Sequence, residues 1–315
     1  MAYMARNSLI SWNPAALMPQ AKSVICVAMA YHKALGGYGN ALIPYNPPFQ
    51  GRPPLLGRVA RYAWGCDYHR VMKERLSKLA SFLLKRGAKE AKGYVDAAPL
   101  LEKALAARAG IGGFGKNSMI ISRDLGSRFF LGEVLTDLEL EPDIPKKPVD
   151  PCGKCEACIE ACPAGAIVAP YVVDARRCIS YLTVELKGSI PGELRSLIGD
   201  RAFGCEACQE ACPHSSIRDS DVSLERGFPP PEEAYWPSGP YIDLAELLTL
   251  SEEGFRAKFK GTALARAKRQ GLRRNAAIAL GNLKHPGAIP LLKATVNDED
   301  PVVRSHVIWA LSQCT

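Results

Sequence analysis

The chain has 315 residues, 47% of them hydrophobic, and a formal net charge of +8. That length can form two or three hydrophobic cores, and no apolar run reaches the roughly 18 residues that span a bilayer. The composition thus excludes a membrane-spanning protein, and the mild basicity suits an anionic partner without requiring one. No signal sequence is recognised, and Cys26, Cys66 and Cys314 look unpaired, so we expect a reducing, cytoplasmic location.

The first part of the chain alternates strand-like runs with amphipathic helices. The strand-like runs are Ser23–Ala30, Gly93–Asp96 and Ser118–Ser122, and the helices are Tyr68–Arg86 and Leu100–Ala109. This alternation is typical of an α/β or α+β domain. We therefore predict a catalytic domain over residues 1–145.

Two aspartates in this region have competing interpretations. Asp67-Tyr-His69 is similar to the start of the D-x-H-x-x-G signature of some corrinoid proteins, but Met72 replaces the glycine, and capping of the next helix explains Asp67 at least as well. Asp96 ends a strand-like run, and N-capping of the following helix is the interpretation that the residues alone favour. The alternative for Asp96 is a general acid, which needs a raised pKa.

A glycine-rich segment, Gly110–Asn117, nearly matches a phosphate-binding loop. Asn117 stands where that motif needs Ser or Thr to hold magnesium, and the segment follows a predicted helix rather than a strand. Nucleotide hydrolysis is therefore disfavoured. We expect a turn fitted against a flat or bulky ligand, because glycines permit close backbone approach.

Seven cysteines form two related runs, each followed by proline, and an eighth lies between the runs. The first run is Cys152, Cys155, Cys158 and Cys162, the second is Cys205, Cys208 and Cys212, and Cys178 lies between them. In bacterial two-cluster ferredoxins the last cysteine of such a run ligates the other cluster. The spacing therefore predicts two 4Fe–4S clusters, one held by Cys152, Cys155, Cys158 and Cys212, and the other by Cys162, Cys178, Cys205 and Cys208.

Zinc and disulfides are the alternatives for these cysteines. Zinc ribbons also use C-x2-C pairs, but they do not need a proline after each run. Disulfide frameworks are typical of small secreted domains. We predict an electron-transferring, ferredoxin-like module over residues 146–220, followed by a linker over residues 221–250 that contains the proline-rich stretch after Gly227.

Residues 251–315 have a helical pattern with a weak internal repeat. Arg273–Leu280 resembles Arg304–Leu311, and Asp298-Glu-Asp-Pro301 supplies a helix start before the second copy. HEAT-type repeats and a plain helical bundle explain this equally well. The stretch Phe255–Arg274 has eight basic and no acidic residues, which favours contact with nucleic-acid backbone over docking on an acidic domain.

Taken together, these motifs resemble those of the epoxyqueuosine reductases, a family whose core is similar to that of the reductive dehalogenases. The resemblance rests on the eight cysteines and on these segments: Asp67–His69, Val95–Asp96, Arg108–Gly112, Gly115–Asn117, Arg177–Thr183 and Arg274–Asn282. It implies an α+β protein with an α/β-type cobalamin-binding catalytic domain, a bacterial two-cluster ferredoxin-like module, and HEAT-like helical repeats at residues 251–315 that bind tRNA.

The reaction implied by the resemblance is the reduction of epoxyqueuosine to queuosine at the wobble position of tRNA, with cobalamin and electrons relayed by two 4Fe–4S clusters. Asp96 would then be the proton donor, and Ile120, Leu131 and Ser180 would contact cobalamin. The implied partners are tRNA and a low-potential electron donor, and the implied state is a monomer. The alternatives are a reductive dehalogenase-like corrinoid enzyme, and a non-catalytic ferredoxin-type electron carrier or corrinoid activator.

Overall fold

The structure is a computed structural model that describes residues 13–31, 55–96, 98–143, 150–215 and 240–314. The chain divides into two compact units, each assembled from three separate segments. The first unit comprises Met1–His32, Tyr68–Glu156 and Cys212–Pro231, and the second comprises Lys33–Asp67, Ala157–Ala211 and Glu232–Thr315. Within the described ranges, no helix is both long and apolar enough to cross a membrane.

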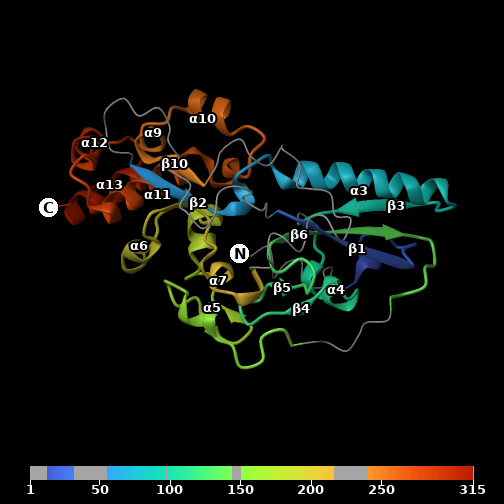
Figure 1. The fold of residues 1–315 in the computed structure, drawn as a ribbon. Coiled ribbons are helices and arrows are strands. Elements are labelled where there is room, and N and C mark those ends of the chain that lie inside the picture. The colour runs from blue at the N-terminus through green and yellow to red at the C-terminus, as the bar shows by residue number, and fades with distance from the viewer. Residues whose placement is uncertain (1–12, 32–54, 97, 144–149, 216–239, 315) are drawn as a thin grey trace, which may run out of the picture. The chain divides into compact units, whose positions relative to one another are not determined.

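The first unit is built on a three-stranded antiparallel sheet in the order β1-β6-β3 (Figure 1). The strands are β1 (Ser23–Ala30), β6 (Phe129–Thr136) and β3 (Ala91–Tyr94). Cys26 of β1 and Tyr94 of β3 both lie opposite Glu133 of the central strand β6. Since the strands are antiparallel, the described part of this unit is α+β rather than α/β.

Two helices cover the two faces of this sheet. Helix α3 (Tyr68–Lys85) packs so closely on one face that a Cβ added at Gly132 of β6 would lie 2.7 Å from Met72 Cε. Helix α4 (Glu102–Arg108) belongs to the opposite face, where Leu105 packs with Leu135 and Ala107 packs with Leu131. Side chains alternate along a strand, so Glu133 shares the α4 face with Leu131 and Leu135.

The glycine-rich segment forms part of a short hairpin in the first unit. Strand β4 (Gly113–Phe114) pairs with β5 (Ile120–Ile121), and the unit also contains the short helices η1 (Pro14–Ala16) and η4 (Pro213–Ser215). A Cβ at Gly112 would lie 2.3 Å from the Ile121 carbonyl oxygen, and one at Gly115 would lie 2.6 Å from Ile121 Cδ1. Packing on β5 therefore already explains these two glycines, and a role in ligand contact stays a prediction.

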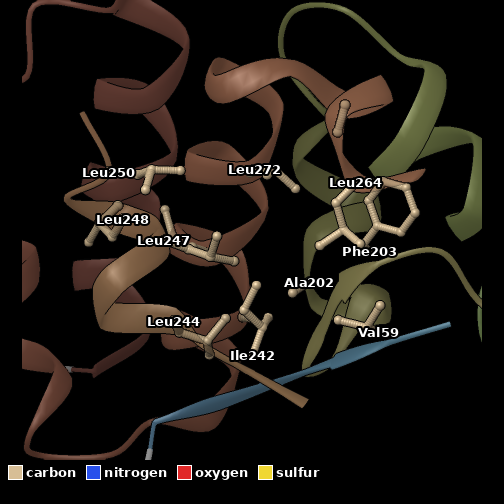
Figure 2. Close-up of a cluster of buried hydrophobic side chains, with 14 of the residues drawn as sticks. Val59, Ala202, Phe203, Ile242, Leu244, Leu247, Leu248, Leu250, Leu264 and Leu272 are labelled. Carbon is tan, nitrogen blue, oxygen red and sulfur yellow. The ribbon is translucent and has the colours of Figure 1, made fainter. Parts of the chain in front are cut away.

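The core of the second unit lies between a mixed sheet and a group of helices. The sheet has the order β10-β2-β9, with strands β10 (Tyr241–Asp243), β2 (Leu56–Val59) and β9 (Arg201–Phe203). Figure 2 shows Val59, Phe203 and Ile242 from these strands converging with leucines of α9 (Leu244–Leu248) and with Leu264 and Leu272. Residues 240–250, predicted to be part of a linker, therefore form β10 and α9, and their four leucines are buried in this core.

The remaining elements of the second unit are mostly helical. They are η2 (Arg61–Ala63), α5 (Ala157–Glu160), β7 (Ile167–Ala169), β8 (Val172–Val173), the π-helical η3 (Tyr181–Glu185), α6 (Gly192–Ile198), α7 (Ala207–Glu210), α10 (Glu252–Phe259), η6 (Ala263–Ala267), α11 (Lys268–Leu283), α12 (Ala288–Ala294) and α13 (Pro301–Cys314).

Helices α11 and α13 carry the two copies of the internal repeat and pack directly on each other. A Cβ at Gly281 of α11 would lie 2.7 Å from the Ala310 Cα of α13, so a glycine lets the helix backbones approach closely. The Asp300 carboxylate accepts hydrogen bonds from Val302 N and Val303 N at the start of α13. This confirms the helix start predicted at Asp298–Pro301.

Candidate active site and iron–sulfur ligands

Asp96 lies just beyond the end of β3, where two residues of α3 hold its carboxylate. Asp96 Oδ2 accepts a hydrogen bond from Tyr68 Oη at 2.8 Å and lies 3.1 Å from His69 Nε2. The Tyr68 ring is itself fixed, because it stacks on Phe130 with centroids 4.2 Å apart. The Asp96 side chain is 42% exposed, so the carboxylate is both positioned and accessible to a ligand.

Asp96 does not cap the next helix, so the N-capping interpretation is wrong. Helix α4 begins at Glu102, six residues later, and its N-cap residue Leu101 makes no side-chain capping bond. A turn intervenes, with Leu100 N donating to the Ala98 carbonyl at 2.8 Å. Asp96 has a φ of 50°, in the left-handed region that is uncommon for residues other than glycine. A turn of this kind needs support from its surroundings.

That support comes from Glu102, a residue to which the sequence analysis gave no role. The Asp96 backbone N–H donates to Glu102 Oε1 at 2.5 Å. Behind Glu102 lies Glu133 of the central strand, whose residue is 0% exposed. Neither carboxyl oxygen of Glu133 accepts a hydrogen bond from a donor group of another described residue, and the Glu102 carboxyl group is its polar neighbour. The signal that could have revealed Glu133 is a single charge within the apolar run Phe129–Thr136.

Burial changes the protonation of this group of side chains. It is the main cause that raises the pKa of Glu133, and the neighbouring Glu102 carboxyl raises it further. Burial also raises the pKa of Glu102, and the Asp96 charge adds to this, although the Asp96 N–H acts in the opposite direction. The pKa of Cys26 rises to about 12, through burial and then through Glu133 and Glu102, so its thiol is neutral.

The eleven cysteines all lie in the described ranges, and all are free thiols, which excludes the disulfide alternative. In the first unit, Cys152 lies near Cys155 and Cys212, and the pKa of its thiol is raised, mainly by burial. Lys116 of the glycine-rich segment donates its backbone N–H to Cys152 Sγ at 3.3 Å. The phosphate-loop-like segment therefore supports a predicted cluster ligand.

The second predicted ligand set lies wholly within the second unit. Burial and the neighbouring thiols raise the pKa of Cys205, with Cys178 and Cys162 among the contributors. The pKa of Cys208 rises to about 12, again mainly through burial. Ala166 N donates to Cys162 Sγ at 3.1 Å, the type of backbone contact that tunes iron–sulfur centres. These four thiols fit one cluster, whose iron would displace the protons.

Cys158, the remaining ligand predicted for the first cluster, is a buried residue of α5. Among the residues with described positions, no three Cys, His, Asp or Glu side chains form a ready cage for a single metal ion. The assignment to clusters therefore depends on the eight-cysteine pattern rather than on a preformed single-ion site.

The residues expected to contact cobalamin fall into both units. Ile120 and Leu131 belong to one apolar cluster of the first unit, together with Leu125 and Phe129. Ser180 belongs to the second unit and immediately precedes the π-helical turn η3, two residues after Cys178. Ile120 and Leu131 therefore lie together in the first unit, whereas Ser180 belongs to the second unit.

The basic stretch Phe255–Arg274, predicted to contact nucleic-acid backbone, is only partly exposed. Arg273 and Arg274 are buried, at 6% and 1% exposure, and Arg273 pairs with Asp298. Three further cations have acidic partners: Arg256 with Glu252, Lys258 with Glu246, and Arg266 with Glu185. The exposed members without such a contact among those described are Lys260 and Lys268.

Arg274 instead organises the segment that follows Cys178. Its guanidinium donates to the carbonyls of Leu182 and Leu186 at 2.7 and 2.9 Å, and to that of Gly188 at 2.7 Å. The neighbouring Asn275 donates to the Thr183 carbonyl at 2.7 Å. Helix α11 therefore holds the π-helical turn η3 in place through buried hydrogen bonds.

The described residues combine an α+β domain that has a positioned carboxylate with eight thiols in two-cluster spacing and with paired C-terminal helices, an arrangement that suits an iron–sulfur oxidoreductase. Family models agree with each part. A 4Fe–4S double cluster binding domain matches residues 151–215, the model described as epoxyqueuosine reductase QueG, DUF1730 matches residues 12–97, and HEAT repeats match residues 261–314. The last match favours HEAT-type repeats over a plain bundle.

Full-length relatives identify the family. The epoxyqueuosine reductases of Salmonella typhimurium strain LT2 and Escherichia coli K12 are 42% and 41% identical to this chain, over 99% of it and over 77% and 78% of their own lengths. A crystal structure of epoxyqueuosine reductase with an epoxyqueuosine-modified tRNA-Tyr stem loop matches with a TM-score of 0.81 and 35% identity, covering 96% of this chain and 76% of that one. The chain belongs to the epoxyqueuosine reductase family.

Proposed function

We propose that this protein reduces epoxyqueuosine to queuosine at the wobble position of tRNA. The observation that carries the proposal is similarity over 99% of the chain to enzymes of that name. The comparison structure that holds a modified tRNA stem loop supports the same substrate class. No feature of the described residues favours the dehalogenase or electron-carrier alternatives over this reaction.

The reaction converts an epoxide into an alkene and water. Both carbon–oxygen bonds of the epoxide break, two electrons enter, and two protons are taken up by the departing oxygen. Negative charge develops on that oxygen as the first bond breaks, so an acid placed beside it lowers the barrier. We assign this role to Asp96, whose partly exposed carboxyl is held by Tyr68 and His69.

Two 4Fe–4S clusters supply the electrons in this proposal. Cys152, Cys155, Cys158 and Cys212 would hold the first cluster, and Cys162, Cys178, Cys205 and Cys208 the second. The free state of all eight thiols supports this assignment, as do the backbone N–H bonds to Cys152 and Cys162. A low-potential donor, which the chain does not identify, would reduce the clusters.

We also assign cobalamin to this chain, with Ile120, Leu131 and Ser180 as contacts. The residues fit such a group in one respect: Leu131 is half-buried against the apolar cluster that contains Ile120, and neither residue supplies a metal ligand, which suits a flat cofactor held by packing. Because Ile120 is itself buried, its contact would be made through the backbone. His69 is not placed as a cobalt ligand here, because its Nε2 faces Asp96. When bound, cobalamin supplies a reducing metal centre for the carbon–oxygen bond.

The domain roles follow from these assignments. Residues 1–145 would form the cobalamin-binding catalytic domain, residues 146–220 the cluster module, and residues 251–315 the tRNA-binding repeats, in a monomeric protein. The exposed Lys260 and Lys268 are the basic residues that we assign to phosphate contact, in place of Arg273 and Arg274.

An anaerobic single-turnover assay tests the function. Cluster-reconstituted protein would be given a chemical reductant and tRNA bearing epoxyqueuosine, with and without cobalamin, and the digested nucleosides would be weighed by mass spectrometry. Loss of one oxygen atom only when cobalamin is present is the expected result. No conversion by protein that holds both clusters and cobalamin would contradict the proposed substrate.

A further inference from the structure

Two carboxyl groups, those of Glu102 and Glu133, lie one behind the other next to the Asp96 turn, and Glu133 is fully buried whereas Glu102 is half-buried. Glu102, the first residue of α4, touches Asp96 through the 2.5 Å hydrogen bond from the Asp96 N–H. Glu133 lies on the neighbouring central strand with 0% exposure, and no donor group of another described residue bonds to its carboxyl oxygens. Its carboxyl group is within hydrogen-bonding reach of the Glu102 carboxyl group, provided that one of the two carries a proton. Among the described residues, no lysine or arginine is one of the main groups that shift the pKa of either carboxyl.

Two carboxylates in such a place cannot both be ionised. A buried ionised carboxylate requires a cation or several hydrogen-bond donors, and Glu133 has neither. Two neighbouring negative charges repel strongly at low dielectric, so the pair retains one proton where isolated carboxyl groups would have lost both. The raised pKa values of both residues agree with this argument.

The hydrogen bonds indicate where the proton lies. Glu102 accepts the Asp96 N–H, so negative charge on Glu102 is stabilised by that donor. Glu133 has no donor, so the proton is best placed on Glu133, which can then donate it toward Glu102. This arrangement leaves a neutral acid in the core and a charged acceptor at the Asp96 turn.

We propose that Glu102 and Glu133 share a single proton and together act as positioning residues that hold the Asp96 carboxyl in place for the reduction. This inference rests on the proposed function, because Asp96 is taken as the proton donor. The turn has an unfavourable φ of 50°, and the Glu102 carboxylate is the side chain that binds its N–H. Losing the shared proton would push the two carboxylates apart and release the turn.

The other titratable groups around the pair cannot replace this proton. Cys26 faces Glu133 from β1 as a neutral thiol, and Tyr94 faces it from β3. His69 of α3 and Asp96 act on Glu102 with opposite effects on its pKa. We therefore expect turnover to fall at alkaline pH, when the pair loses its last proton.

Infrared spectroscopy of the protein, without tRNA, tests the shared proton directly. The carbonyl band of a protonated carboxylic acid is expected to persist above pH 7 in the wild type and to be absent from Glu133→Gln. A matched control, Glu139→Gln, changes a glutamate whose side chain is 85% exposed and should leave the band in place. A wild-type spectrum with no such band above pH 7 would overturn the proposal, even if the variants did not fold.

Kinetics then test positioning. Glu102→Gln should lower kcat roughly tenfold or more, because a small displacement of a reacting group is enough to slow the reaction, while KM for tRNA and iron content stay near wild type. Glu133→Gln cannot lose a proton, so its alkaline loss of kcat should shift upward by about one pH unit or more. An unshifted alkaline limb in Glu133→Gln, or a Glu102→Gln defect confined to KM or iron content, would overturn the proposal.

The two possible failures are separable. If the wild type does not convert epoxyqueuosine in tRNA, the proposed function fails while the infrared band can still be present. If the wild type converts the substrate and the band is absent, only the shared proton fails.

Discussion

Asp96 is the residue whose identity the proposed reaction depends on most directly. Replacing it by asparagine keeps the shape of the side chain and removes the proton. We expect Asp96→Asn to reduce single-turnover rates by about 10²-fold or more, the usual contribution of a general acid, with both clusters retained. The measurement is the rate of oxygen loss from the modified nucleoside, alongside iron content and the visible spectrum.

Asp143→Asn is the matched control, because Asp143 is exposed and lies outside this site. Its rate should equal that of the wild type. If Asp96→Asn keeps full activity, the proton must reach the departing oxygen from another donor, and Asp96 has a structural role only.

Arg274 shows how strongly a single buried residue can act on its neighbours. It donates to three backbone carbonyls and is 1% exposed, and burial lowers its pKa to about 10. Arg274→Gln should lower the free energy of unfolding by about 3 kcal/mol or more, because buried carbonyls lose their donors. Denaturant unfolding followed by circular dichroism measures this.

The control for Arg274 is Arg256→Gln, which removes an exposed cation paired with Glu252. Such surface pairs contribute little, so the change should stay within about 0.5 kcal/mol. Equal destabilisation by the two variants would contradict the bracing role assigned to Arg274.

The helices and strands with strong periodicity could be predicted from the sequence. The strand Ser23–Ala30 is confirmed, and the helix predicted at Tyr68–Arg86 ends one residue earlier, at Lys85. Helix α4 was predicted to start at Leu100 but starts at Glu102. Asp96 is therefore too far from the helix start to cap it. Short-range propensity does not detect a turn that depends on a carboxylate from the following helix.

The site itself could be predicted only in part. The cysteine motif carries its chemistry in its spacing, so a double-cluster domain at residues 151–215 could be predicted without the fold, and the individual ligands stay a prediction. Glu102 and Glu133 were missed because their proximity exists only after β6 and α4 pack together. The basic stretch gave a wrong expectation of its exposed charge, because a count of basic residues does not tell which side chains are buried. The alanine-rich sequence after Arg274 was the available sign that this residue is buried.

Because Arg273 and Arg274 are buried, we expect tRNA to contact the exposed lysines of the basic stretch Phe255–Arg274 instead. Lys260→Glu combined with Lys268→Glu should weaken binding and reduce the magnitude of its salt dependence by up to about two counterions. The measurement is tRNA affinity at several salt concentrations. The charge-matched control is Lys73→Glu combined with Lys78→Glu, since both lysines are exposed on α3 and Lys78 pairs with Glu74 there. If the two variants bind tRNA with equal affinity and equal salt dependence, the tRNA contacts lie on other residues.

In the second unit, the buried His306 makes the free energy of unfolding depend on pH. His306 accepts a hydrogen bond from Ile190 N at 3.1 Å, and its Nδ1 donates to the Val302 carbonyl at 2.7 Å. Burial lowers the pKa of His306 from 6.5 to about 4. Between pH 6.5 and about pH 4 the histidine is therefore protonated in the unfolded chain and neutral in the folded chain. The free energy of unfolding falls as the pH drops through that interval.

His306→Gln should remove about 2 kcal/mol of the stability change between pH 7 and pH 5, because glutamine can keep both hydrogen bonds and does not titrate. Denaturant unfolding at pH 7 and pH 5 measures the difference between the two proteins. His285→Gln serves as the control. An equal loss of stability on acidification in wild type and His306→Gln would show that other groups set it.

The contacts of Arg274 also bear on the order of events during synthesis. The turn after Cys178 is braced by a helix that leaves the ribosome much later, and α11 in turn packs on the last helix, α13. A nascent chain that already displays Cys162, Cys178, Cys205 and Cys208 therefore still lacks the brace for one of these ligands. We expect iron–sulfur insertion at this set to follow translation of the C-terminal helices, so that an interrupted chain would expose thiols before they could hold a cluster.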